Sequence, residues 1–152
     1  MRINNVAAAK TLLYITAATN NMVEILSAKI TNEDNETNEQ ILCTIQKITT
    51  LGTPTATTLT GAKHEKGSAT MSSTVKGNVT AAEPTYGAIA QDADIVDAFD
   101  TQGTSSLGGW FHSPIPEERV YVSGGDSYGL RLVNAPAVAI DLAISFTFRE
   151  IN

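Results

Sequence analysis

The sequence predicts one all-β domain, an antiparallel β-sandwich with a long, loop-rich middle segment. Three observations predict it. Apolar residues near the C-terminus alternate with polar or small ones, short β-rich segments are separated by turn-forming residues, and the composition is that of a globular chain. The 152 residues are 42% hydrophobic and 17% charged, which is enough to bury a core without disulfides.

Strands are predicted in the N-terminal third at Thr11–Ile15, Met22–Leu26 and Ile41–Ile48. Asn-rich or acidic turns separate them, and the acidic segment 32–39 is expected to be a solvated loop. A helix competes over Ala7–Ala18 because of its alanines, but Thr, Ile and Tyr in this stretch favour a strand.

The middle of the chain, from Leu51 to about Gly109, is rich in Thr, Ser, Ala and Gly and poor in large apolar residues. Such a segment cannot build much core alone. We expect either long loops with short strands draped over the sandwich, or a surface that becomes ordered against a partner.

In the last third, Arg119–Val122 and Tyr128–Val133 flank a Gly-containing turn and predict a β-hairpin. The turn Asn134–Pro136 then leads into a long final strand. Every second residue of that strand is apolar, so one face covers a core and the other faces water or a neighbouring subunit. The apolar set is Val138, Ile140, Leu142, Ile144, Phe146 and Phe148. Together these elements predict an antiparallel meander.

Charge and hydropathy argue against two classes of partner. The formal charge is −6 with a pI near 4.8, and the absence of any Lys/Arg run is unlike a nucleic-acid-binding protein. The apolar runs are far shorter than the roughly 20 residues of a membrane helix. Lys10 interrupts any signal-peptide core, so an untargeted protein is expected.

Residues capable of chemistry are sparse, and neither a catalytic site nor a bound cofactor is predicted. His64 and His112 share no metal-ligand spacing, and Cys43 lies in an apolar run typical of a buried thiol. The acidic run Gln91–Asp100 lacks the glycine turn and distal Glu of a calcium loop, so we expect a strand with solvated carboxylates and no metal. A hydrolase built from distant residues is the weaker alternative.

The most singular stretch is Gly108–Pro116, which contains Trp110, the only tryptophan, followed by Phe111. An exposed Trp-Phe pair would anchor a protein partner or stack on a sugar ring. Alternatively, Trp110 fills the core of the sandwich. Both interpretations remain open from the sequence.

Several short motifs in the second half of the chain occur in an order that resembles small β-sandwich virion proteins of tailed bacteriophages. These motifs are Lys76–Thr80, Glu83–Tyr86, Gly108–Trp110, Pro116–Val120, Gly124–Gly125 and Gly129–Leu132. Ser123 departs from the pattern, because a proline-rich turn is expected before the glycine pair.

The resemblance implies a jelly-roll-like head decoration, or cement, protein made in the host cytoplasm. Such a protein sits as a homotrimer on the outer capsid surface and binds the major capsid protein. The small residues Ala139, Ala143 and Ser145 would then allow close approach between subunits, and residues 1–10 would form an extended N-terminal arm.

The alternative function is a carbohydrate-binding or receptor-binding head of a phage fibre or tail-associated protein. In that case, Trp110 and nearby tyrosines would stack on sugars. The sequence shows no stalk of heptads or triple-helical repeats, which favours decoration.

Overall fold

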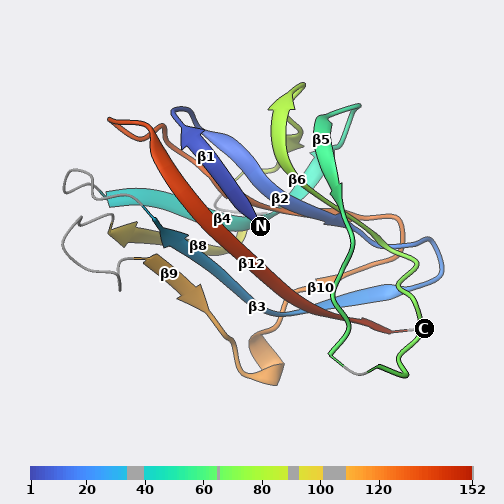
Figure 1. The fold of residues 1–152 in the computed structure, drawn as a ribbon. Coiled ribbons are helices and arrows are strands. Elements are labelled where there is room, and N and C mark those ends of the chain that lie inside the picture. Colours follow the sequence, from blue (N-terminus) through green and yellow to red (C-terminus); the bar gives the residue numbers. More distant parts are fainter. Residues whose placement is uncertain (34–39, 65, 89–92, 101–108, 152) are drawn as a thin grey trace.

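A computed structural model describes residues 1–33, 40–64, 66–88, 93–100 and 109–151, with the backbone alone for residues 40 and 93–100. Twelve strands and one short 3-10 helix are described (Figure 1). The elements are β1 Arg2–Val6, β2 Lys10–Thr16, β3 Met22–Asn32, β4 Gln40–Thr50, β5 Thr55–Leu59, β6 Thr74–Ala81, β7 Thr85–Tyr86, β8 Ala93–Asp100, β9 Gly109–His112, η1 Pro116–Glu118, β10 Tyr121–Val122, β11 Ser127–Leu132 and β12 Ile140–Ile151.

The strands form two antiparallel sheets. Sheet A has the order β1-β12-β3, with β9 and β10 pairing successive stretches of the free edge of β3. Sheet B has the order β5-β6-β2-β11-β4, with β7 and β8 pairing successive stretches of β4. Strand β8 of sheet B contacts β9 of sheet A, so the two sheets approach each other along this side (Figure 1).

The route of the chain is that of a jelly roll. Consecutive strands β1 to β4 alternate between the sheets, and β10 to β12 alternate again on the way back. The last two strands each insert between two earlier ones, because β11 lies between β2 and β4, and β12 lies between β1 and β3. The all-β, jelly-roll-like sandwich predicted from the sequence is therefore confirmed.

The core fills the space between the sheets with aliphatic side chains. Fully buried residues come from β2, β3, β4, β11 and β12 alike: Leu12, Ile15, Ile25, Ile30, Ile41, Ile45, Leu130, Leu132, Ile140 and Leu142. Cys43 is buried among them, as predicted. The alternation in the last strand is confirmed for Ile140, Leu142 and Ile144, whereas Val138 precedes β12 and is 42% exposed.

The predicted C-terminal hairpin and meander are wrong. Strand β10 belongs to sheet A and β11 to sheet B, so the turn Ser123–Asp126 connects the two sheets. It lies against another crossing between the sheets, the one from β2 to β3. Ala17 donates its N–H to the Asp126 carbonyl, and Gly125 donates its N–H to the Ala17 carbonyl. A glycine turn between two β-rich segments fits either a hairpin or a crossing between sheets, and here tertiary pairing decides.

Gly124 lies where these two crossings touch. A Cβ atom at this position would come within 2.2 Å of the Thr19 carbonyl oxygen, whereas at Gly125 nothing lies within 4 Å. We predict that Gly124→Ala lowers the free energy of unfolding by about 1–3 kcal/mol, because backbone must shift to accommodate the methyl group. Gly125→Asn should cost under about 1 kcal/mol, because Asn tolerates a positive φ. Urea unfolding of both variants checks this, and equal costs would contradict it.

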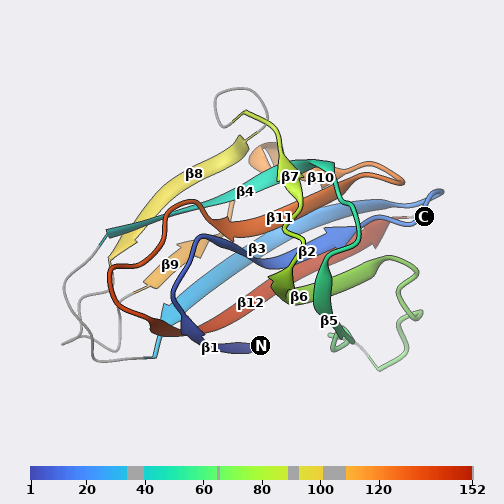
Figure 2. The same cartoon turned by 90° about the horizontal axis from the view of Figure 1, so that it is seen from above.

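The middle segment combines both short strands and loops. Strands β5 and β6 extend sheet B beyond β2, and the chain from β6 to β7 crosses over this sheet (Figure 2). A second apolar cluster forms on that outer face from Tyr14, Ile48 and Val79, covered by Leu51, Ala56 and Tyr86. In the residues that the structure describes, this segment forms short strands and loops draped over the sandwich, as the first of the two expectations has it.

Residues 1–10 are not a free arm. Residues Arg2–Val6 form β1 at the edge of sheet A, paired with β12. The strand is short and its register shifts between Ile3 and Val6, where Asn5 has φ of 57°. Short, bulged and polar edge strands resist pairing with other chains.

Candidate interaction surface on the outer face of sheet A

One buried row of residues defines which side chains of sheet A point outward. Ile144 of β12 pairs with Ile30 of β3, and Ile30 pairs with Trp110 of β9. All three are buried, with Trp110 only 4% exposed. Because side chains alternate along a strand, the residues on either side of this row face away from the core.

Trp110 therefore fills the sandwich core and offers no surface to a partner. Its ring stacks on His112, two residues further along β9, at a centroid distance of 5.8 Å and an interplanar angle of 10°. Sequence analysis predicted Trp110 as an interface residue, but the structure places it in the core, which was the alternative interpretation. Phe111, which points the other way, is 67% exposed.

Two outward rows bring together residues that are far apart in the sequence. One row consists of Ser145, Lys29 and Phe111, and the other of Arg2, Ala143 and Thr31. Three of the predicted interface residues, Phe111, Ala143 and Ser145, thus share one face of sheet A. Ala139 immediately precedes β12 and lies outside this strand.

A hollow of about 420 Å³ opens on this face between β1, β12 and β3. We call it the sheet-A hollow. It is lined by Met1, Arg2, Lys29, Thr31, Ala143, Ile144 and Ser145. Small side chains on β12 leave this space open, so a side chain from another molecule can approach the sheet closely.

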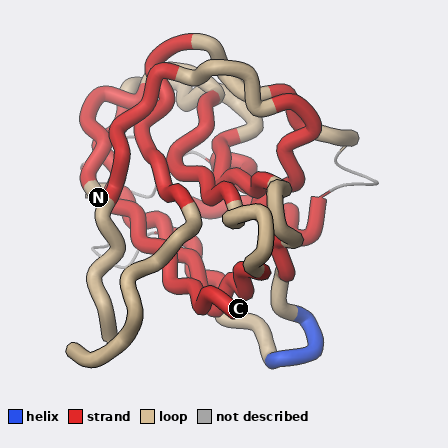
Figure 3. Tube along the Cα trace, turned by 90° about the vertical axis from the view of Figure 1, so that its right-hand side faces the viewer, coloured by secondary structure: helices blue, strands red, loops and turns tan. Residues whose placement is uncertain are grey.

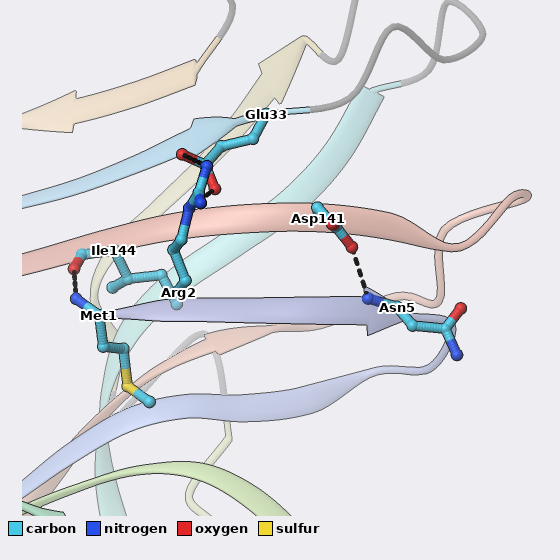
Figure 4. A network of polar contacts seen from close by, with 6 residues as sticks. All are labelled: Met1, Arg2, Asn5, Glu33, Asp141 and Ile144. Atoms are coloured by element: carbon cyan, nitrogen blue, oxygen red, sulfur yellow. Dashed lines mark hydrogen bonds and ion pairs between the residues drawn. The ribbon is translucent and has the colours of Figure 1, made fainter.

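Strand β1 forms one wall of the hollow and is fixed by polar contacts (Figure 4). The Met1 amine donates to the Ile144 carbonyl at 2.6 Å, and the Ile144 N–H donates to the Met1 carbonyl at 2.8 Å. The Asn5 N–H donates to Asp141 Oδ1 at 2.7 Å, which satisfies the backbone where the register shifts. These bonds set the position of Arg2 beside β12.

The two cations at the hollow differ in their partners. Arg2 forms a bidentate pair with Glu33, at 2.5 Å from Nε to Oε2 and 2.9 Å from Nη2 to Oε1. The hydrogen bond to Glu33 raises the pKa of Arg2. Lys29 is exposed and forms no ion pair with any carboxylate in the described parts of the chain. Among the described residues, it is the cation of this face that has no ion-pair partner.

A second charged cluster lies further along the same face, centred on Glu24. This carboxylate is 1% exposed and accepts hydrogen bonds from Arg119 Nη1 at 3.0 Å, Arg149 Nε at 2.8 Å and the Tyr121 hydroxyl at 3.2 Å. The bond from Arg119 lowers the pKa of Glu24, with smaller contributions from Arg149 and Tyr121, against the opposing effect of burial. The cluster ties β10 and the segment before it to β3 and β12.

The described residues on this face carry one more positive than negative charge, whereas the chain as a whole is acidic. Among the described residues, the cations on it are Arg2, Lys29, Arg119 and Arg149, and the carboxylates are Glu24, Glu33 and Asp141. The whole chain carries ten Lys and Arg against sixteen Asp and Glu. The surroundings of sheet A are therefore suited to an acidic partner surface.

The other residues considered for chemistry do not converge. Within the described residues, no group of three or more His, Cys, Asp or Glu is placed to hold a metal ion. His64 is exposed beyond β5, and Cys43 is buried on the opposite sheet. Ala93–Asp100 of the acidic run form β8 in their backbone, as predicted, while residues 91–92 and the side chains of the run lie outside the described residues. No helix in the described ranges is long and apolar enough to cross a membrane.

Arg2 and Lys29 are the functional candidates that sequence analysis missed. Lys29 lies beyond Leu26, where the predicted strand ended, although Ala28 and Ile30 alternate with Lys29 and Thr31 in the continuation of β3. That alternation was the available signal.

Comparisons of this chain with protein families, curated proteins and solved structures found no match.

Proposed function

We propose that this chain is a structural virion protein, a decoration or cement protein that binds the outer surface of a tailed-phage capsid. In this proposal, it acts as a homotrimer and its partner is the major capsid protein. The strand order carries the proposal, because the double-sheet jelly roll recurs in viral capsid and lectin domains. Its short or broken sheet edges also suit a protein that must assemble in a defined way.

Two of the resemblance motifs, Glu83–Tyr86 and Gly129–Leu132, meet on sheet B, so their residues have a structural role in the fold. Glu83 Oε2 accepts hydrogen bonds from the Thr11 N–H at 3.0 Å and the Thr11 hydroxyl at 2.6 Å. The hydroxyls of Tyr86 and Thr11 are 2.7 Å apart, and Arg131 lies 4.5 Å above the Tyr86 ring. Gly129 leaves space for that ring, since a Cβ there would meet its hydroxyl. Motifs separated by over 40 residues thus contact each other, and these contacts hold the middle segment against sheet B.

The proposed mechanism is thermodynamic linkage. A protein that binds only the assembled, expanded shell stabilises that state by mass action. A trimer that spans neighbouring capsomers adds avidity, so individually weak contacts give tight attachment. No reacting group is needed for such a role.

The direct test is cosedimentation of the purified protein with a panel of undecorated tailed-phage heads. We expect saturable binding to expanded heads and weaker binding to unexpanded ones. Binding to host polysaccharide without binding to any head would instead support the receptor-binding alternative. In that alternative, sugars would have to stack on exposed rings such as Phe111 and Tyr121, because Trp110 is buried.

Phe111 provides a variant that separates binding from stability. Because its ring is 67% exposed, Phe111→Ala should change the free energy of unfolding by less than about 0.5 kcal/mol. An aromatic anchor at an interface is costly to remove, so the apparent affinity for heads should fall at least about tenfold. Urea unfolding and cosedimentation of the same preparation measure both effects. Unchanged head binding would remove Phe111 from the interface.

A further inference from the structure

The segment between β9 and β10 projects from the body of the sandwich. It comprises residues 113–118, with η1 at its end, and we call it the η1 knob (Figures 1 and 3). Pro114 and Pro116 restrict its backbone, and Ile115 is extended with φ of −64° and ψ of 159°. The Glu118 N–H donates to the Ile115 carbonyl at 3.0 Å. The knob is thus a short, stiffened projection.

The tip of the η1 knob is both apolar and acidic. Ile115 is 58% exposed, and no residue of η1 is buried. Glu117 and Glu118 are exposed and take part in no ion pair within the described ranges. The following residue, Arg119, is held by Glu24 at 3.0 Å, which anchors the base of the knob to sheet A.

The sheet-A hollow has the complementary features. Its floor includes the outward-facing small side chains of Ala143, Thr31 and Ser145, whereas the Ile144 side chain faces the core. Lys29 at its rim has no ion-pair partner in the described chain. The knob therefore offers carboxylates and one exposed aliphatic side chain, and the hollow offers a free ammonium group beside small side chains. Opposite charges of this kind guide association and fix its register.

We infer that the η1 knob of one copy of this chain docks in the sheet-A hollow of a second copy. Lys29 then pairs with Glu117 or Glu118 of the neighbour, and Ile115 packs over Ala143. The two surfaces are different parts of the chain, so the contact is heterologous and produces a closed ring when the rotation between copies closes. The trimeric size of that ring rests on the proposed function, whereas the contact itself does not.

The experiment measures mass by light scattering across a dilution series, without any phage head present. The wild-type chain should form a trimer, and high salt should weaken it because the ion pair is screened. Lys29→Glu should raise the concentration at which the trimer dissociates at least about tenfold. The matched control Lys66→Glu makes the same charge change at an exposed residue beyond β5 and should behave as the wild type.

Rescue makes the test specific to this pair of surfaces. The variant Glu117→Lys/Glu118→Lys should dissociate like Lys29→Glu, and the chain carrying all three substitutions should recover the trimer. A monomeric wild type, an intact Lys29→Glu trimer, or no recovery in the triple variant would each overturn the inference.

The two proposals fail in distinguishable ways. A trimer that depends on Lys29 but ignores all heads supports the inference and contradicts the decoration function. A Lys29→Glu trimer that remains intact but loses head binding would mean that the hollow contacts the capsid, and would overturn docking between copies.

Discussion

Replacing Trp110 with alanine should lower the free energy of unfolding by about 3–5 kcal/mol. The indole is 4% exposed and occupies the row of Ile144 and Ile30 inside sheet A. Its removal loses the burial of a large ring and leaves a cavity that neighbouring strands can fill only partly. A loss of this size is a large fraction of the 5–15 kcal/mol typical of a domain. Urea unfolding of the purified variant measures it.

The neighbouring position is the matched control. Phe111 lies on the same strand and faces outward, so its alanine variant should unfold at nearly the wild-type urea concentration. The pair thus separates a core aromatic residue from a surface one. A Trp110→Ala variant as stable as the wild type would contradict the core assignment and restore Trp110 as a candidate for partner binding.

The strands that sequence analysis predicted best carry a strong local signal, which is a short run of apolar and β-branched residues in β2 and β4 and alternation in β12. All three lie within a few residues of their predicted bounds. Strand β1 was missed because Arg2–Val6 contains three polar residues among five and pairs only along one side. An edge strand of this composition has no local signal that separates it from an arm.

Long-range pairing was beyond the sequence patterns. The turn Ser123–Asp126 has the glycines and β-rich flanks of a hairpin, but its flanking strands pair with β3 and β2 instead of with each other. Nothing local specifies this choice. It follows from the fit of two crossings between the sheets, where Gly124 touches Thr19.

The candidate surface was predicted in part. Phe111, Ala143 and Ser145 follow from alternation and from the unusual Trp-Phe pair, because a residue next to a buried one on a strand faces outward. The contributions of Arg2 and Lys29 depend on β1 and on the end of β3, which pair with the first half of β12. Only the register of sheet A brings these charges beside the small residues.

Glu24→Gln should lower the melting temperature at pH 7 by roughly 5–10 °C, because it leaves the side chains of Arg119 and Arg149 without their shared carboxylate. The partners are partly exposed, which reduces the effect below that of a fully buried pair. Differential scanning calorimetry across a range of pH measures the change. A variant with the wild-type melting temperature would show that solvent replaces the carboxylate at no cost.

The pH dependence gives the sharper test of the Glu24 cluster. The hydrogen bond from Arg119 holds the folded-state pKa of Glu24 below its usual value of 4.5. A lowered pKa means that the unfolded chain binds the proton more readily, so the stabilisation is fully present above pH 4.5 and is lost as pH falls through the folded-state pKa.

Glu150 also has a lowered pKa, because hydrogen bonds from Ser73 and Ser72 outweigh its burial. The difference in melting temperature between the wild type and Glu24→Gln removes that shared contribution. It should be constant at neutral pH and shrink below pH 4.5, and a difference that stays constant to the acid limit would contradict the assignment of Glu24 as the ionised centre of the cluster.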